Sequence, residues 1–266
     1  GTVLNKSIKS VPTRSTLPVL GCAFFEVVEN SLVIKTTNLE IYYSERIPVE
    51  KAELGKIAIP IHKLIEITNA INEEQIGFFV SDTGKVTIDS GSGKYTIMGQ
   101  HADEFPSDPV INDAQTLNLN SKQMLNIINN TTYAASKDDM KPVLQGVYLL
   151  FENNQIVSVA TDGHKLVKVK TPTSTTFNGS IIVPVKFLET IKGLIENEVE
   201  IYIGENHIQT TCGPATISSR IIRDKYPDYE KVIPKDNPYK LKVEKDILVE
   251  SVKRVSIFSN KTTKQI

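Results

Sequence analysis

The sequence Ala160-Thr161-Asp162-Gly163-His164-Lys165-Leu166 separates two stretches in which apolar residues fall at every second position. One stretch is Gln155–Val159 and the other is Val167–Lys170. Alternation with a period of two predicts a β-strand that buries one face. Asp-Gly between two such strands predicts a tight turn, because glycine adopts positive φ without steric cost. The motif therefore predicts a strand–turn–strand unit with a histidine, a lysine and a leucine at its junction.

The same junction occurs about 124 positions earlier, as Thr37-Asn38-Leu39-Glu40. Ile59-Pro60 corresponds to Val183-Pro184 at the same spacing, and Phe105-Pro106 corresponds to Tyr226-Pro227 at a slightly shorter one. The order of predicted helices and strands agrees as well. A repeat of about 120 residues has the size of a whole domain, whereas solenoid repeats have periods of about 20–50 residues. The sequence therefore predicts tandem copies of one domain.

The second copy shows the predicted elements most completely. Ser121 is the predicted N-cap of a first helix, whose apolar face begins at Met124. A second helix follows Pro184, with apolar residues spaced as a helical stripe from Phe187 to Ile195. The predicted strands of this copy are residues 116–119, 143–152, 155–161, 165–171, 199–203, 207–211 and 216–222.

The first and third copies are incomplete. The first copy begins within its first helix, at Val3 and Leu4, and its second helix follows Pro60. A third copy begins at Tyr239 with a predicted strand through 241–243, followed by a helix from about residue 247. We therefore expect a chain trimmed at both ends, with domains at 1–113, 114–237 and 238–266, the last of them mostly missing.

The composition is that of an ordinary globular protein. The 266 residues are 40% hydrophobic and 23% charged, with a net charge of −1, so the total charge alone predicts no nucleic-acid partner. The two cysteines, Cys22 and Cys212, form no CxxC pair, which argues against a zinc site and against a disulfide scaffold. No apolar run approaches the length of a membrane-spanning helix. We expect a soluble, cytoplasmic protein.

Four motifs in a fixed order identify a family. They are Ser15-Thr16-Leu17-Pro18-Val19-Leu20-Gly21, Thr37–Glu40, Ala160–Leu166, and Tyr226-Pro227-Asp228-Tyr229 followed by Val232-Ile233-Pro234. In this order and spacing they resemble the bacterial replicative sliding clamp, the beta subunit of DNA polymerase III. The resemblance covers almost the whole chain. It implies an α+β DNA clamp fold of repeated domains, each with two helices packed on antiparallel sheets.

The resemblance also implies an assembly and its partners. A protomer of three domains would form a head-to-tail homodimer, closed into a ring around duplex DNA with helices inside and sheets outside. Such a ring does no chemistry and needs no cofactor or metal, because it tethers a polymerase by raising its effective concentration on DNA. The implied partners are duplex DNA, the DNA polymerase III alpha subunit, the clamp loader, and other polymerases and repair proteins that bind through short linear peptides.

The resemblance places lysines on the helix faces that would line the pore, where they would attract phosphates without reading bases. Arg14 precedes the first motif at a position that touches DNA in the family, and a matching loop of the second copy carries two lysines. Glu66 and Glu189 interrupt the pattern, and ordinary solvated helix faces also explain these lysines. Lys253 and Arg254 continue the series on the last predicted helix. The residues expected to face DNA are Lys6, Lys9, Arg14, Lys63, Lys122, Lys137, Lys141, Lys186 and Lys192.

The resemblance further implies a peptide-binding pocket on the second copy, beside the 160–166 motif. Apolar side chains would form a cleft, Gly163 would leave it open, and His164 and the lysine stems would line its rim. Because the first copy has Leu39 and Glu40 at the corresponding positions, we expect the cleft only in the second copy. From the sequence alone, His164 is better explained as a structural turn residue. The residues expected to form the pocket are Leu144, Thr161, Gly163, His164, Lys165, Leu166, Pro227, Lys231 and Val232.

Two other readings of the sequence compete with the clamp. In an enzyme, Asp162 and His164 would act as an acid–base pair, but Asp162 is better explained as a turn residue. The sequence has no nucleophile elbow, no complete phosphate-binding loop, and no histidines at metal-ligand spacing. The other alternative is a non-catalytic binding protein of duplicated domains that has no part in DNA replication.

Overall fold

The computed structural model describes residues 1–260, except residues 74 and 176. Residues 261–266 of the expected third domain therefore lie outside the described residues. The chain divides into two compact units, Gly1–Tyr226 and Pro227–Ile266. The first unit contains both copies of the repeat. Within the described part of the chain, no helix is long and apolar enough to cross a membrane.

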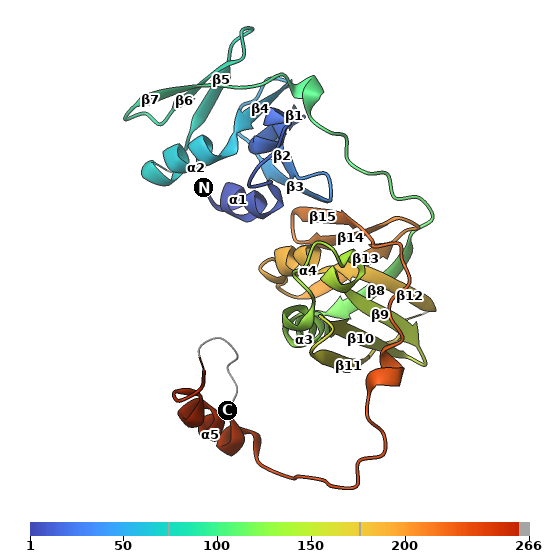
Figure 1. The fold of residues 1–266 in the computed structure, drawn as a ribbon. Helices are drawn as coiled ribbons and strands as arrows, with labels where there is room; N and C mark the ends of the chain where they lie inside the picture. The colour runs from blue at the N-terminus through green and yellow to red at the C-terminus, as the bar shows by residue number, and fades with distance from the viewer. Residues whose placement is uncertain (74, 176, 261–266) are drawn as a thin grey trace. The chain divides into compact units, whose positions relative to one another are not determined.

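The two copies contain the same elements in the same order, except that the second copy begins with a strand, β8, that has no counterpart among the residues described for the first (Figure 1). In the first copy these are α1 (Thr2–Ser7), β1 (Cys22–Val28), β2 (Ser31–Thr37), β3 (Ile41–Pro48), β4 (Gly55–Pro60), α2 (Ile61–Ala70), β5 (Gly77–Val80), β6 (Lys85–Asp89) and β7 (Lys94–Met98). In the second copy they are β8 (Gln115–Asn120), α3 (Ser121–Thr131), β9 (Gly146–Glu152), β10 (Gln155–Thr161), β11 (Leu166–Pro172), β12 (Gly179–Pro184), α4 (Val185–Lys192), β13 (Glu198–Ile203), β14 (His207–Cys212) and β15 (Ala215–Arg220). The tandem repeat predicted from the sequence is confirmed.

The strands form three antiparallel sheets, one of which joins the two copies. Its order is β4-β1-β2-β3-β15-β14-β13-β8, and the other two sheets are β11-β10-β9-β12 and β5-β6-β7. The joint is the pairing of β3 with β15, in which Tyr43 lies opposite Ile217. Tyr43 is buried in the core of the second copy, so the two copies share packed side chains as well as backbone hydrogen bonds.

The helices form where the sequence predicts them, with two corrections. Helix α4 ends at Lys192, short of Ile195, the last residue of the predicted apolar stripe. The second correction is at the start of α3. The N-cap is Asn120 and not Ser121. The Asn120 side chain accepts a hydrogen bond from the Gln123 amide at 2.9 Å, and the Gln123 side chain accepts one from the Asn120 amide at 2.9 Å. This reciprocal capping box satisfies two backbone donors at once, which a serine cap without the glutamine contact does not. Helices α3 and α4 lie side by side and bury apolar faces against the sheets (Figure 1).

At one equivalent contact, the two copies fill their cores with side chains of different sizes. In the second copy, Gly146 lies opposite Pro184 in the β9–β12 ladder, and a Cβ on it would lie 2.4 Å from Cγ2 of Ile182. In the first copy, the residue opposite Pro60 is Cys22, and the position of Ile182 is taken by Ala58. A larger residue on one strand is therefore matched by a smaller one on its neighbour, as dense packing requires.

The second unit contains a short 3₁₀ turn, Tyr229–Val232, and helix α5, Lys245–Ser256. Helix α5 is confirmed, but it has no buried residue. The strand predicted at 241–243 is wrong, because these residues form no regular structure. Their alternating pattern suits a strand, but a strand exists only where a neighbouring strand pairs with it, and none of the described residues does so.

Candidate partner-binding and DNA-facing surfaces

The turn between β10 and β11 is held by two side chains. The Thr161 hydroxyl donates to the Lys165 carbonyl at 2.7 Å and accepts from the Gly163 amide at 3.0 Å. The Asp162 carboxylate accepts from the amides of His164 and Lys165, each at 2.9 Å. Gly163 has φ +92°, a conformation that other residues rarely adopt. The turn therefore brings five of the expected pocket residues, Thr161 and residues 163–166, into one short segment.

The corresponding turn of the first copy, between β2 and β3, repeats this hydrogen-bond pattern. Thr37 donates to the Ile41 carbonyl at 2.8 Å and accepts from the Leu39 amide at 2.9 Å. The Asn38 side chain accepts from the amides of Glu40 and Ile41. Leu39 holds the left-handed position, with φ +73° and a side chain that is 41% exposed. The first copy thus places an apolar side chain where the second has none.

Asp162 is a structural residue of the turn. Its side chain contacts the Lys165 ammonium as well as the two backbone amides. The Lys165 contact, and then these amide hydrogen bonds, hold the pKa of the Asp162 carboxyl well below its usual range. A carboxylate that stays ionised and is occupied by three donors is unsuited to taking a proton from His164. The prediction that Asp162 serves the turn is confirmed.

Leu144 lies at the same end of the sheet as this turn. It belongs to a short 3₁₀ turn, Pro142–Gln145, so the strand predicted at 143–152 is wrong for its first three residues and begins at Gly146 as β9. The antiparallel neighbour of β9 is β10, which ends at Thr161. Its carbonyl accepts from the Ser136 amide at 2.8 Å, and its side chain is half-buried. An apolar side chain that is partly open to solvent here can contribute to a cleft.

An aromatic pair supports this end of the sheet. The rings of Tyr148 and Tyr226 stack with centroids 5.0 Å apart, and the Tyr226 hydroxyl lies 3.5 Å from the Val159 carbonyl oxygen. Burial raises the pKa of Tyr226 to about 12, so the ring stays neutral. The stack fixes the end of the first unit, directly before Pro227.

The first copy has the same aromatic pair but a more closed surface. Phe24 and Phe105 stack at 5.0 Å, and the Lys35 ammonium lies 5.6 Å from the centre of the Phe24 ring. Lys35 also forms an ion pair with Asp108 at 2.8 Å. Leu20, the counterpart of Leu144, is buried. The apolar side chain that is partly open in the second copy is therefore covered in the first.

The remaining expected pocket residues, Pro227, Lys231 and Val232, belong to the second unit. Lys231 forms an ion pair with Asp228 at 3.0 Å within that unit. Val232 is 67% exposed, at the end of the 3₁₀ turn Tyr229–Val232. Within this unit, Val232 therefore offers an uncovered apolar side chain.

Most of the cations expected to face DNA are exposed, while Lys6 is half-buried. Lys122 follows the N-terminus of α3, and Lys137 and Lys141 lie in the loop after that helix. Three of the expected residues have partners that reduce their free charge. Lys63 pairs with Glu66 at 3.0 Å, Lys186 lies 3.9 Å from Glu40, and the Lys9 ammonium is next to the C-terminal end of α4 at Gly193.

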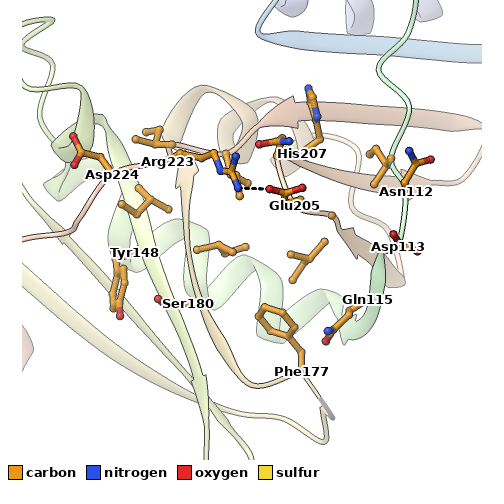
Figure 2. A pocket seen from close by; sticks show the side chains of 18 of the residues that line it. Asn112, Asp113, Gln115, Tyr148, Phe177, Ser180, Glu205, His207, Arg223 and Asp224 are labelled. Carbon is orange, nitrogen blue, oxygen red and sulfur yellow. Dashed lines mark hydrogen bonds and ion pairs between the residues drawn. The ribbon is translucent and has the colours of Figure 1, made fainter.

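A groove that no sequence pattern predicts lies elsewhere on the second copy (Figure 2). Its volume is about 1000 Å³. It lies between the segment 110–115, strand β12, the β13–β14 hairpin and the segment 221–226. Mixed apolar and charged lining from four separate segments leaves no local pattern, so periodicity and motifs do not reveal it.

The described residues hold no group of three or more His, Cys, Asp or Glu side chains that could bind a metal ion. Cys22 and Cys212 are both buried, and burial raises the pKa of each thiol. A buried, protonated thiol is a poor nucleophile and a poor metal ligand.

These observations define a class: a tandem-domain α+β protein whose two copies are joined edge to edge. The chain matches two family models, DNA polymerase III beta subunit, N-terminal domain, over residues 2–109, and the central domain of the same subunit over residues 118–228. The chain belongs to the bacterial beta sliding clamp family. That family is a family of non-catalytic processivity factors, so the enzyme reading is excluded.

Individual relatives agree with this assignment. The beta sliding clamp of Pseudomonas putida is 30% identical over 256 residues, covering 94% of this chain and 70% of that protein. The Chlamydia muridarum clamp is 26% identical over 270 residues, covering 100% of this chain and 74% of that protein. Among solved structures, the Bartonella birtlesii clamp bound to griselimycin matches with a TM-score of 0.90 at 26% identity, covering 99% of this chain and 73% of that one. The Bacillus subtilis clamp, at 22% identity and a TM-score of 0.91 over 97% of this chain and 71% of that one, supports the fold. The α+β clamp fold predicted from the sequence is confirmed.

Proposed function

We propose that the protein is part of a ring that encircles duplex DNA and tethers the replicative polymerase for processive synthesis. The observation that carries the proposal is the β3–β15 ladder, in which two unlike strands of successive copies join their sheets. A contact between unlike surfaces can repeat from copy to copy, and it closes into a ring if the rotation allows.

Both strands needed to repeat this joint have a free edge. β7 corresponds to β15 in the repeat, and it is the end strand of the β5-β6-β7 sheet. β11 corresponds to β3, and it is the end strand of the β11-β10-β9-β12 sheet. We propose that β11 joins the third domain of the same protomer and that β7 joins the third domain of a second protomer. The resulting assembly is the head-to-tail homodimer of three-domain protomers, with domain boundaries near residues 113 and 237.

We also propose that polymerases, the clamp loader and repair proteins insert short apolar peptides beside the β10–β11 turn. The support is the half-buried Leu144 at the same sheet end, the side-chain-free Gly163, and the closed counterpart in the first copy. A cleft present in one copy only gives each protomer one docking site. The resemblance to the family adds Pro227, Lys231 and Val232 to the residues that we propose to bind peptides.

The pocket can be tested by titrating a fluorescein-labelled peptide, carrying the clamp-binding segment of a bacterial replicative polymerase, into the 266-residue chain. Leu144→Glu should weaken binding about tenfold or more, because a charged side chain in an apolar anchor site has hot-spot effects. The matched control is Glu40→Ala at the corresponding turn of the first copy, which should bind as the unaltered chain does. Unchanged affinity after Leu144→Glu combined with Pro227→Ala would exclude this pocket.

The proposed DNA contact is electrostatic and independent of sequence. Anisotropy of labelled duplexes should show binding that falls steeply as salt rises, because the contact releases counterions from phosphates. Two duplexes of equal length and unrelated sequence should bind equally. A strong preference for one of them, or binding that ignores salt, would count against the DNA-facing role of the helix lysines.

We place the protein in the cytoplasm, where bacterial replication proceeds. The competing role is that of a duplicated-domain binding protein outside replication. Failure to associate with primed circular DNA at every salt concentration, with the complete protein and a clamp loader supplied, would favour that role.

A further inference from the structure

We propose that the groove beside β12 is a second docking site on this chain, separate from the β10–β11 turn. It would take an extended peptide with apolar side chains flanked by lysine or arginine, and the peptide would add to β12 as a further strand. The proposal goes beyond the clamp function and does not depend on it.

The outer backbone edge of β12 is only partly used by the chain itself. β12 is the end strand of its sheet, and it pairs with β9 on one side only. The Ile182 carbonyl accepts from the Ile222 amide at 2.9 Å, so the backbone of Ile182 faces away from β9. Backbone direction alternates along a strand, so Ser180 has its N–H and C=O on the same outer side. No backbone partner for Ser180 on that side occurs among the described residues.

The first copy covers more of the same edge with its own chain. Ala58, the counterpart of Ile182, exchanges two backbone hydrogen bonds with Gln100, at 3.2 and 2.7 Å. Lys56, the counterpart of Ser180, forms an ion pair with Asp103 at 2.5 Å, within a 3₁₀ turn at Ala102–Glu104. In the second copy, Ser180 cannot form this ion pair, and residues 221–226 contain no such turn. The first copy therefore covers this edge with two backbone hydrogen bonds and an ion pair, whereas the second copy covers it with one backbone hydrogen bond at Ile182.

The side chains that line the groove suit an extended peptide. Phe177, Ile221 and Ile222 are half-buried and offer apolar contacts to alternate side chains of a strand. Figure 2 shows Ser180 and Tyr148 on one side of the groove and Asn112, Asp113 and Gln115 on the other. A groove between a free strand edge and apolar walls is the usual site for strand addition.

The charges at the rim favour a basic peptide. Arg223 and Glu205 form an ion pair at 2.6 Å and largely neutralise each other (Figure 2). Burial, and to a lesser degree Arg220, lowers the pKa of His207, which leaves its ring neutral near pH 7. The remaining charged residues of the lining are Asp113, Asp224 and Lys225, so negative charge prevails. Basic flanking residues would therefore bind more tightly than acidic ones.

The test uses two synthetic peptides, acetyl-Lys-Val-Ile-Val-Lys-amide and acetyl-Glu-Val-Ile-Val-Glu-amide, titrated into the isotope-labelled 266-residue chain. Amide resonances of residues 179–182 and 221–224 should shift saturably with the lysine peptide, with at least about fivefold weaker binding of the glutamate peptide. Asp224→Lys should reduce or reverse this preference. Resonances of the β10–β11 turn should stay in place, which separates this site from the proposed pocket.

Two variants at one position separate backbone from side-chain recognition. Ser180→Pro removes the outward N–H, which is not used in the β9 ladder, and should abolish the shifts. Ser180→Ala keeps the N–H and should bind as the unaltered chain does. An unchanged circular dichroism melting curve for Ser180→Pro shows that loss of binding is not loss of fold. The proposal is overturned if neither peptide gives saturable shifts, if both bind equally, or if Ser180→Pro binds normally.

Discussion

The β2–β3 turn and the β10–β11 turn share their hydrogen bonds and differ in their central residue. In each, a threonine closes the turn, and an Asn or Asp side chain accepts from two amides. Leu39 and Gly163 hold the same left-handed position, at φ +73° and +92°. The threonine and the Asn or Asp therefore set the turn in both copies, and the glycine of the second copy leaves its surface free of a side chain. In the proposed function, the binding cleft of the second copy therefore depends on the loss of a side chain from a turn that both copies share.

The largest expected effect concerns the core contact between Gly146 and Ile182. Gly146→Cys introduces into the second copy the residue found at Cys22, and its Cβ would clash with Ile182. Overpacking of this kind should lower the free energy of unfolding by about 2–3 kcal/mol, measured by urea denaturation. Adding Ile182→Ala recreates the Cys22–Ala58 pair of the first copy.

This double variant should be more stable than the sum of the two single effects by about 1–2 kcal/mol, because the two positions share one space. Additive losses would show that the two copies do not match at this contact. In that case Cys22 and Gly146 would correspond in the sequence repeat but not in how their side chains pack.

The next effect concerns the turn itself. Gly163→Ala should destabilise the protein by about 1–2 kcal/mol, because a residue with a Cβ is strained at positive φ. No atom lies within 4 Å of the added Cβ, so the loss would come from backbone strain alone. Leu39→Gly should be nearly neutral, since relief of strain is offset by the greater freedom of glycine in the unfolded chain. Equal effects at both turns, measured by thermal unfolding, would refute the difference drawn between them.

The smallest effect is a difference in acid sensitivity. Asp162 has a depressed pKa in the folded state, so its stabilising contribution is present above its ordinary pKa and is lost as pH falls through the folded value. Asn38 makes the same amide contacts without titrating. The amide resonances of His164 and Lys165 should therefore shift only at a pH well below about 4, the ordinary value for an Asp carboxyl, while those of Glu40 and Ile41 stay constant. Asp162→Asn should remove the pH dependence, and parallel shifts at both turns would contradict this account.

Local patterns in the sequence predicted most of the fold, because alternation and helical stripes are set by which face of each element is buried. The duplicated turn could also be predicted, since Thr, Asp and Gly act on near neighbours in the chain. The cap at Asn120 was missed by one position, because Asn and Ser are both good caps and only the Gln123 contact distinguishes them.

Long-range features could not be predicted in the same way. The β3–β15 joint depends on two strand edges more than 160 residues apart, and neither strand has a sequence pattern that identifies its partner. The alternation at 241–243 predicted a strand that lacks a neighbour. The groove beside β12 depends on Ser180 replacing a lysine and on a missing turn, which only a comparison of the two folded copies reveals.

In the proposed ring, the joint between β3 and β15 would give the assembly a direction. Since the joint pairs two unlike strands, every further copy added in the same way keeps the orientation of the one before it. All β10–β11 turns would then open on one rim, and the opposite rim would carry none. A polymerase arriving on DNA would meet a ring whose two faces differ. Its direction along the duplex would therefore follow from the orientation in which the ring was loaded.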